Sequence, residues 1–145
     1  MAQDLKRNSY SQSGIIVRKL EYTETAYITT TPTDSGVAVT GNAVWGDVEF
    51  STCEVAMEAY GTTYNIEVTA TFEGTANNYA GVLTGMMSGR WVVRLTDLNG
   101  DRWLVGTEDE ALRFEWSQRR SSDPGTLTMT LKWKVEGREP IRRIV

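Results

Sequence analysis

The residue types that most often carry out catalysis are scarce in this chain. It contains no histidine and a single cysteine, Cys53. Without imidazole there is no Ser–His or Cys–His nucleophile pair, and one thiol cannot build a zinc site that needs several Cys or His ligands. Cys53 lies in a stretch typical of a strand, so we interpret it as a small buried hydrophobe. We therefore expect no catalytic residue, no metal site and no cofactor.

Acidic residues are the remaining candidates for chemistry. The segment 97–101 (Asp-Leu-Asn-Gly-Asp) and Glu108 share the spacing of several calcium ligands in an EF-hand loop. Gly100 stands too early for that motif, and the flanking runs have the pattern of strands, so a plain hairpin turn is favoured. The acidic cluster 108–110 fits a solvated loop. An enzyme that uses carboxylates alone is the weakest of the hypotheses.

Length and charge narrow the choice of function. The chain has 145 residues, which fits one domain. Its formal charge of −4 argues against a general nucleic-acid binder. The charge is uneven, because residues 1–75 carry four basic and ten acidic side chains, and residues 76–145 carry eleven and nine. The basic end with Arg138, Arg142 and Arg143 is interpreted as solvated or facing a partner.

Alternation of apolar and polar residues predicts a chain made mostly of strands. Asn99-Gly100 between two alternating runs predicts a hairpin with a type I′ turn. Residues 23–35 are rich in Thr and are expected to form a loop, and residues 77–88 a short helix. The expected strands cover residues 15–22, 37–39, 45–50, 55–60, 64–73, 91–96, 102–105, 112–116 and 127–135.

These elements predict an all-β or β-dominated fold. We expect an antiparallel β-sandwich or partly closed barrel of about seven to nine strands, with the short helix near residues 77–88. Residues 1–14 are expected to form a flexible N-terminal arm, and residues 15–145 a single β domain. No apolar run approaches the length of a membrane span, and the first residues lack the apolar core of a signal peptide, so we expect synthesis inside the cell.

The five tryptophans are candidates for a carbohydrate-binding platform. Trp91, Trp116 and Trp133 are in phase with apolar neighbours, which predicts that they point inward. Trp45 and Trp103 are the two that we expect to be available for stacking on a sugar or for contact with another subunit.

The chain from residue 71 to 145 resembles a known class of proteins. A β segment is followed by a short Gly-rich helix (77–89) and by the run 90–106, Arg-Trp-Val-Val-Arg-Leu-Thr-Asp-Leu-Asn-Gly-Asp-Arg-Trp-Leu-Val-Gly. Residues 112–114 and a long final strand (125–135) complete the pattern. It is similar to small structural proteins of tailed bacteriophages and of prophages of gut bacteria, of the tail-tube, tail-terminator or distal-tail type. The resemblance implies a sandwich or barrel with one helix, joined into rings through sheet edges.

The function that we expect is that of a non-enzymatic virion protein of a phage tail, made in the host cytoplasm. Its partners would be other copies of itself, in a homo-oligomeric ring such as a hexamer, and other tail proteins. We expect no membrane contact and at most non-specific passage of DNA. The long final strand, with its face of Thr and Lys, is expected to continue a sheet across subunits. The expected contact residues are Trp45, Trp103, Lys132, Lys134, Arg138, Arg142 and Arg143, and the expected lumen-facing residues are Asp47, Glu67 and Glu73.

A second hypothesis remains open at this stage. The same strands would serve a monomeric β-sandwich module that binds carbohydrate or protein. Two or three exposed Trp or Tyr side chains on one flat face would favour it, whereas self-association would favour the tail protein.

Overall fold

The computed structural model describes residues 14–74, 80–120 and 127–145. Most of these residues lie in strands, and α2 (Ala80–Met86) is the α-helix among them. The expected arm 1–14 lies outside the described residues except for Gly14, as does the start of the expected helix 77–88. The other elements are β1 (Val17–Glu24), the 3₁₀ turn η1 (Thr25–Tyr27), β2 (Ile28–Thr33), β3 (Gly36–Gly41), β4 (Gly46–Val48), β5 (Thr52–Tyr60), β6 (Thr63–Gly74), β7 (Trp91–Asp97), β8 (Arg102–Val105), β9 (Arg113–Arg120), β10 (Leu127–Gly137) and β11 (Arg142–Arg143).

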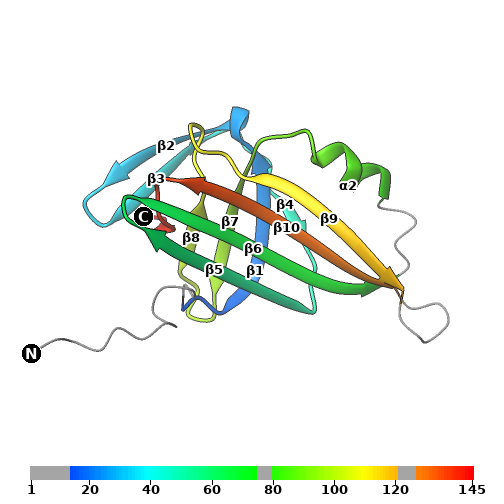
Figure 1. Ribbon diagram of the computed structural model, residues 1–145. Coiled ribbons are helices and arrows are strands. Elements are labelled where there is room, and N and C mark those ends of the chain that lie inside the picture. The colour runs from blue at the N-terminus through cyan, green and yellow to red at the C-terminus, as the bar shows by residue number, and fades with distance from the viewer. Residues whose placement is uncertain (1–13, 75–79, 121–126) are drawn as a thin grey trace, which may run out of the picture.

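Two antiparallel sheets pack face to face, and the β2–β3 hairpin lies to one side (Figure 1). The front sheet has the strand order β5-β6-β10-β9, and the back sheet has the order β11-β8-β7-β1-β4. The fold is therefore a β-sandwich rather than a closed barrel. The alternation of apolar and polar residues in the sequence does not distinguish between a sandwich and a partly closed barrel.

The main core fills the space between the inner faces of the two sheets. Trp133 on β10 is fully buried, and its ring centroid lies 4.9 Å from that of Phe114. Each fully buried Leu, Ile or Val side chain contributes roughly 1.5–3 kcal/mol. The inward phase predicted for Trp91 and Trp133 is confirmed, and Trp116 is half-buried against the same core. The other central members are Leu20, Ile66, Val68, Ala70, Val93, Leu95, Val105, Leu112, Met129 and Leu131.

The short helix near residues 77–88 is confirmed over Ala80–Met86, beside strand β9 (Figure 1). It buries Leu83 and Met86 in the main core. Gly89 ends it, as expected, because its N–H donates to the carbonyl of Met86 at 3.1 Å. A side chain at Gly89 would lie 2.7 Å from the Trp91 ring, so this close approach requires glycine.

The hairpin between β7 and β8 is confirmed, but its turn is not of type I′. Only Gly100 has positive φ (+87°), whereas a type I′ turn needs it at both central residues. The N–H of Asp97 donates to the carbonyl of Asp101 (2.9 Å), which leaves three residues in the loop. One carboxylate oxygen of Asp97 accepts from the N–H groups of Asn99 and Asp101, at 2.9 and 3.0 Å. These bonds stabilise the longer loop with its single left-handed glycine.

The prediction of a loop over residues 23–35 is wrong. Residues 28–33 form β2, which pairs with β3 through the turn at Asp34 and Ser35. Threonine is β-branched and suits an extended strand. Because β2 is exposed along most of its length, it lacks the dry face that marks a strand in sequence.

Candidate functional site

The front sheet has two open edges, strands β5 and β9, because no described strand pairs with the outer side of either. They are nine and eight residues long. Helix α2 lies beside β9, and Leu112, just before β9, forms a bridge with Trp91. β5 is acidic through Glu54 and Glu58, whereas β9, despite one glutamate, is basic through Arg113, Arg119 and Arg120. An open edge presents a row of N–H and C=O groups that can pair with another strand. The two edges of one sheet thus carry opposite charge.

The long final strand β10 is not one of these edges, contrary to our expectation. It lies between β6 and β9 and pairs with both along its length. Its backbone groups are therefore already used on both sides, and it cannot continue the sheet into another subunit. The strand expected over residues 112–116 extends to Arg120 and takes the edge position instead.

The outer face of the front sheet is a wet surface rich in hydroxyl groups, which we call the threonine face. Directly paired residues of an antiparallel sheet point to the same side. Thr130 thus lies between Thr71 and Ser117, and Thr71 is paired in turn with Thr52. Thr69 and Thr128 belong to the same face. No described element covers this face in Figure 1.

Lys132 and Lys134 stand on the threonine face, and each is paired with a glutamate. The Nζ of Lys134 lies 2.8 Å from Glu115, and that of Lys132 lies 3.5 Å from Glu67. The hydrogen bond with Glu115 raises the pKa of Lys134, and the same bond lowers the pKa of Glu115. Each lysine on this face is thus paired with a carboxylate. Arg113 and Arg119 of β9 stand on the same face, opposite Lys134 and Thr128 of β10, and both are exposed.

The three expected lumen residues do not share a surface. Glu67 and Glu73 lie on the threonine face. Asp47 on β4 is paired with Glu21 on β1, which places it on the outer face of the back sheet. These are opposite sides of the sandwich. A lumen lined by the threonine face would include Glu67 and Glu73 and exclude Asp47.

The outer face of the back sheet is covered, unlike the threonine face. The β2–β3 hairpin packs Ile28 and Val37 against Val92 and Leu104, and all four are nearly fully buried. The carboxylate of Glu108 fixes the hairpin further, because it accepts hydrogen bonds from Thr30. These come from the hydroxyl at 2.7 Å and from the N–H at 3.1 and 3.3 Å. The hairpin is thus held by a second apolar cluster and by the half-buried carboxylate of Glu108.

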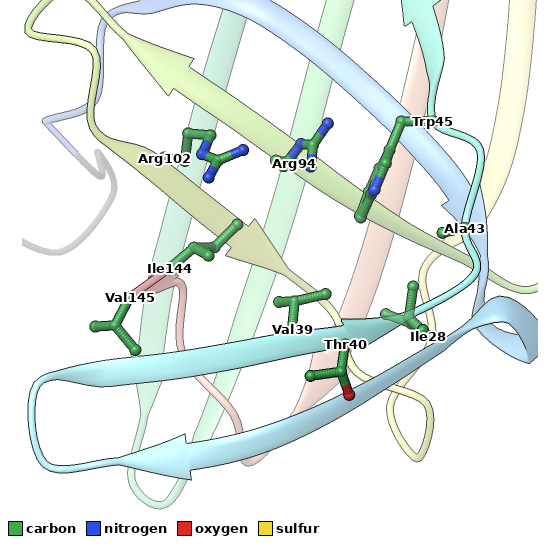
Figure 2. Close-up of a pocket in the computed structure, with 10 residues that line it drawn as sticks. Ile28, Val39, Thr40, Ala43, Trp45, Arg94, Arg102, Ile144 and Val145 are labelled. Atoms are coloured by element: carbon green, nitrogen blue, oxygen red, sulfur yellow. The ribbon is translucent and has the colours of Figure 1, made fainter.

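Trp45 lies on this covered face, at the side of a small hollow (Figure 2). Its ring stacks on Arg94, whose guanidinium carbon is 4.3 Å from the ring centroid. Arg94 also donates two hydrogen bonds to Glu21, at 3.0 and 2.8 Å. The hollow has a volume of about 160 Å³, and Arg102, Val39 and Ile144 are among its other lining residues. Trp45 is therefore partly buried, with one ring face used by an arginine.

Trp103 packs at the margin of the main core. Its indole N–H donates to Asp97 at 3.0 Å, and this bond lowers the pKa of Asp97. The alternating acids of segment 97–101 are thus engaged in a hairpin turn rather than in a metal site. No cluster of ligating side chains suited to a metal ion occurs in the described part of the chain.

Two of the three C-terminal arginines form ion pairs. Arg142 pairs with Glu139 at 2.6 Å, and Arg143 pairs with Asp101 at 2.7 Å. Arg138 is exposed, and its backbone N–H donates to Glu110 at 2.9 Å. The expected contact residues therefore divide between the two sides of the sandwich, with the lysines on one and Trp45 on the other.

The acidic cluster 108–110 has structural partners. Glu108 binds Thr30, and Glu110 accepts the backbone N–H groups of Arg138 and Glu139 at 2.9 and 3.0 Å. Both carboxylates therefore order neighbouring segments of backbone. Each of these two glutamates therefore has a structural role.

Sequence reasoning missed Glu21 and Arg94. Each looked like the ordinary polar position of an alternating strand. They are direct partners across β1 and β7, so their contact follows from the pairing register. Local alternation contains no information about which residues of two distant strands face each other.

Comparison with known proteins found no match to this chain among protein-family models, curated proteins or solved structures. None of the described helices is long and apolar enough to span a membrane.

Proposed function

We propose that this chain is a non-enzymatic structural protein of a phage tail, in which copies join through the edges of the front sheet into a ring or tube. The observation that carries the proposal is the pair of long open edges, β5 and β9, with opposite charge. In this assembly, β9 of one copy lies beside β5 of the next. Other copies and other tail proteins are its partners, and the virion tail is its location.

The direction of the strands supports this arrangement. Neighbours in the front sheet are antiparallel throughout, so β5 and β9 run in opposite directions. Adding β5 of the next copy to β9 continues the alternation without a change of pattern. A contact between two different surfaces closes into a ring when the rotation between copies permits.

The threonine face then lines one side of the assembly. Its lysines are paired with glutamates, and Glu73 adds a further exposed acid. Phosphate binding depends on free Lys and Arg side chains. Arg113 and Arg119 also stand on this face, but the contact between β9 and β5 brings them beside Glu54 and Glu58 of the next copy. A face of hydroxyl groups and of cations paired with carboxylates suits a surface along which DNA passes without binding.

The alternative of a monomeric module that binds carbohydrate or protein has less support. Among the described residues, the most exposed aromatic side chains are Tyr27 (54 %) and Tyr60 (60 %), on η1 and at the end of β5. The partly buried Trp45 and Trp103 are engaged by Arg94 and Asp97. The described residues thus lack a flat platform of exposed tryptophans.

The test is the native mass of the protein by light scattering over a concentration series. The proposal expects a discrete ring or polymers that grow with concentration. Glu54→Lys with Glu58→Lys on β5, or Arg113→Glu with Arg119→Glu on β9, should each abolish assembly. Mixing these two variants should restore pairing between the reversed edges, because opposite charges again face each other.

The matched control is Thr130→Lys, which changes charge on the same sheet but on the interior strand β10. It should leave assembly intact. A strict monomer at every concentration would contradict self-assembly and favour the binding module. Equal loss of assembly in the control would show that overall charge, and not the edges, is responsible.

A further inference from the structure

The hollow on the covered face is lined by aliphatic side chains together with Trp45, Arg94 and Arg102. It holds about 160 Å³ and is lined in part by Ile28, Val39, Ala43 and Ile144 (Figure 2). Beside these residues, Val44 is 89 % exposed and Val145 is 59 % exposed. Cavities of about 150 Å³ accept a benzene-sized apolar group, so the hollow has room for one aliphatic side chain.

The charge of the hollow is positive. Arg94 is neutralised by Glu21, at a side-chain distance of 2.8 Å. Arg102 lies beside Arg94 along the hollow (Figure 2). No ion pair joins the guanidinium of Arg102 to a described residue, and it is exposed. A hollow that combines aliphatic side chains with an unpaired guanidinium is complementary to an aliphatic group that carries a neighbouring carboxylate.

The chain itself presents such a group. Leu98 in the β7–β8 turn is 61 % exposed and stands next to Asp97. Asp101 at the end of the same turn is paired with Arg143 at 2.7 Å, so Asp97 is the acid of this turn that forms no ion pair with a described residue. The turn is held in shape by hydrogen bonds from Trp103, Asn99 and Asp101 to the Asp97 carboxylate. An apolar side chain on an ordered acidic turn loses little conformational entropy on binding.

We propose that the hollow receives the Leu98 turn of a second copy of this chain. Leu98 fills the apolar part, and the acidic turn faces Arg102. Leu98 is exposed within its own copy, so its own hollow does not already hold it. The inference rests on the proposed self-assembly but adds a contact that does not involve the edges β5 and β9.

The experiment is disulfide cross-linking between two single-cysteine additions. Protein with Leu98→Cys is mixed with a size-tagged protein with Ala43→Cys, and the mixture is oxidised. The native Cys53 stays in both, because burial raises the pKa of its thiol to about 12 and keeps it unreactive. The control mixture pairs Leu98→Cys with Thr62→Cys, an exposed turn position on the front sheet.

We expect the Leu98–Ala43 heterodimer in about tenfold excess over the control, because docking raises the effective concentration of the two thiols. Leu98→Asp should remove this excess when present in a competing copy, whereas a competitor with Asn99→Asp should still inhibit cross-linking. Equal yields in both mixtures would overturn the proposal. So would protection of the Ala43→Cys thiol from alkylation in dilute monomer, since another segment of the same chain would then occupy the hollow.

Native mass measured on the same samples separates this inference from the proposed function. Assemblies without the selective cross-link would contradict only the docking of Leu98. The selective cross-link in protein whose edge charges are reversed would support the docking and show that it is independent of the edges. A monomer without the cross-link would contradict both.

Discussion

The two outer faces of this sandwich differ although both belong to antiparallel sheets. The outer face of the back sheet is covered by the β2–β3 hairpin, which buries Val92 at 0 % exposure and Leu104 at 3 %. The threonine face of the front sheet carries hydroxyls and charges and stays open to solvent. The difference begins in the sequence, where β7 and β8 each place an apolar residue on the outer face, Val92 and Leu104, whereas β10 alternates strictly.

The same kind of ion pair has a different environment on each face. Arg94 and Glu21 are 19 % and 11 % exposed, whereas Lys134 and Glu115 are 44 % and 50 % exposed. Exposed pairs contribute about 0–1 kcal/mol, while breaking a buried pair costs about 3–5 kcal/mol. The covered face should therefore hold the fold together, and the threonine face should tolerate change and be available to partners.

The largest expected effect is that of Leu104→Ala on the covered face. Removing this buried side chain should lower the free energy of unfolding by about 3 kcal/mol, because it leaves a cavity under the hairpin. Thr130→Ala on the threonine face is the control and should change it by less than about 0.5 kcal/mol. Urea denaturation at neutral pH measures both. Equal effects would mean that the hairpin is not packed stably on the back sheet.

Much of this contrast could be predicted from sequence. Strict alternation in β6 and β10 identified one wet and one dry face, and the buried Trp133 followed from its phase. The strand β2 was missed because its side chains are exposed on both faces, apart from the buried Ile28 and the half-buried Thr30. The Thr-rich pattern therefore looked like a loop.

The candidate surfaces were harder to predict than the strands. That β10 is interior and β9 is an edge depends on the order of strands, which alternation does not encode. The contacts of Arg94 with Glu21 and Trp45 also join segments that are distant in the chain. By contrast, the Asn-Gly signal located the β7–β8 hairpin, because a turn is set by neighbouring residues.

The two outer faces also differ in how much their ion pairs should contribute to stability. Glu21→Ala should lower the free energy of unfolding by about 2 kcal/mol, between the values for buried and exposed pairs, because Arg94 loses its partner while still half-covered. Glu67→Ala, which removes the partner of Lys132 on the threonine face, should cost less than about 0.5 kcal/mol. Thermal or urea unfolding of both variants checks the difference. A larger cost for Glu67→Ala would reverse the assignment of the two faces.

The hydrogen bonds between Glu108 and Thr30 should make the covered face sensitive to pH. Burial acts to raise the pKa of Glu108, but the hydroxyl and N–H of Thr30 and its own backbone N–H outweigh this and lower it. A lowered folded pKa stabilises the protein fully above the ordinary glutamate value of about 4.3, and the contribution is lost as pH falls through the folded value.

Thr30→Val tests this link because it removes the hydroxyl and keeps the shape of the side chain. It should cost about 1 kcal/mol at pH 7. The cost should shrink when unfolding is measured below the folded pKa, where protonated Glu108 binds the Thr30 hydroxyl of the unaltered protein less strongly. Thr128→Val on the threonine face should show no such pH dependence. A cost for Thr30→Val that is constant with pH would contradict the role of the charged carboxylate.

The smallest expected effect concerns Lys134 and Glu115. A double-mutant cycle with Lys134→Ala and Glu115→Ala should give a coupling energy below about 0.5 kcal/mol, because both side chains are exposed and water competes for them. High salt should reduce it further, since exposed charges are screened. The same cycle for Arg94→Ala and Glu21→Ala should keep most of its coupling in salt. If salt reduced both coupling energies equally, Arg94 and Glu21 would be as hydrated as Lys134 and Glu115. The hairpin would then not shield the face that it covers.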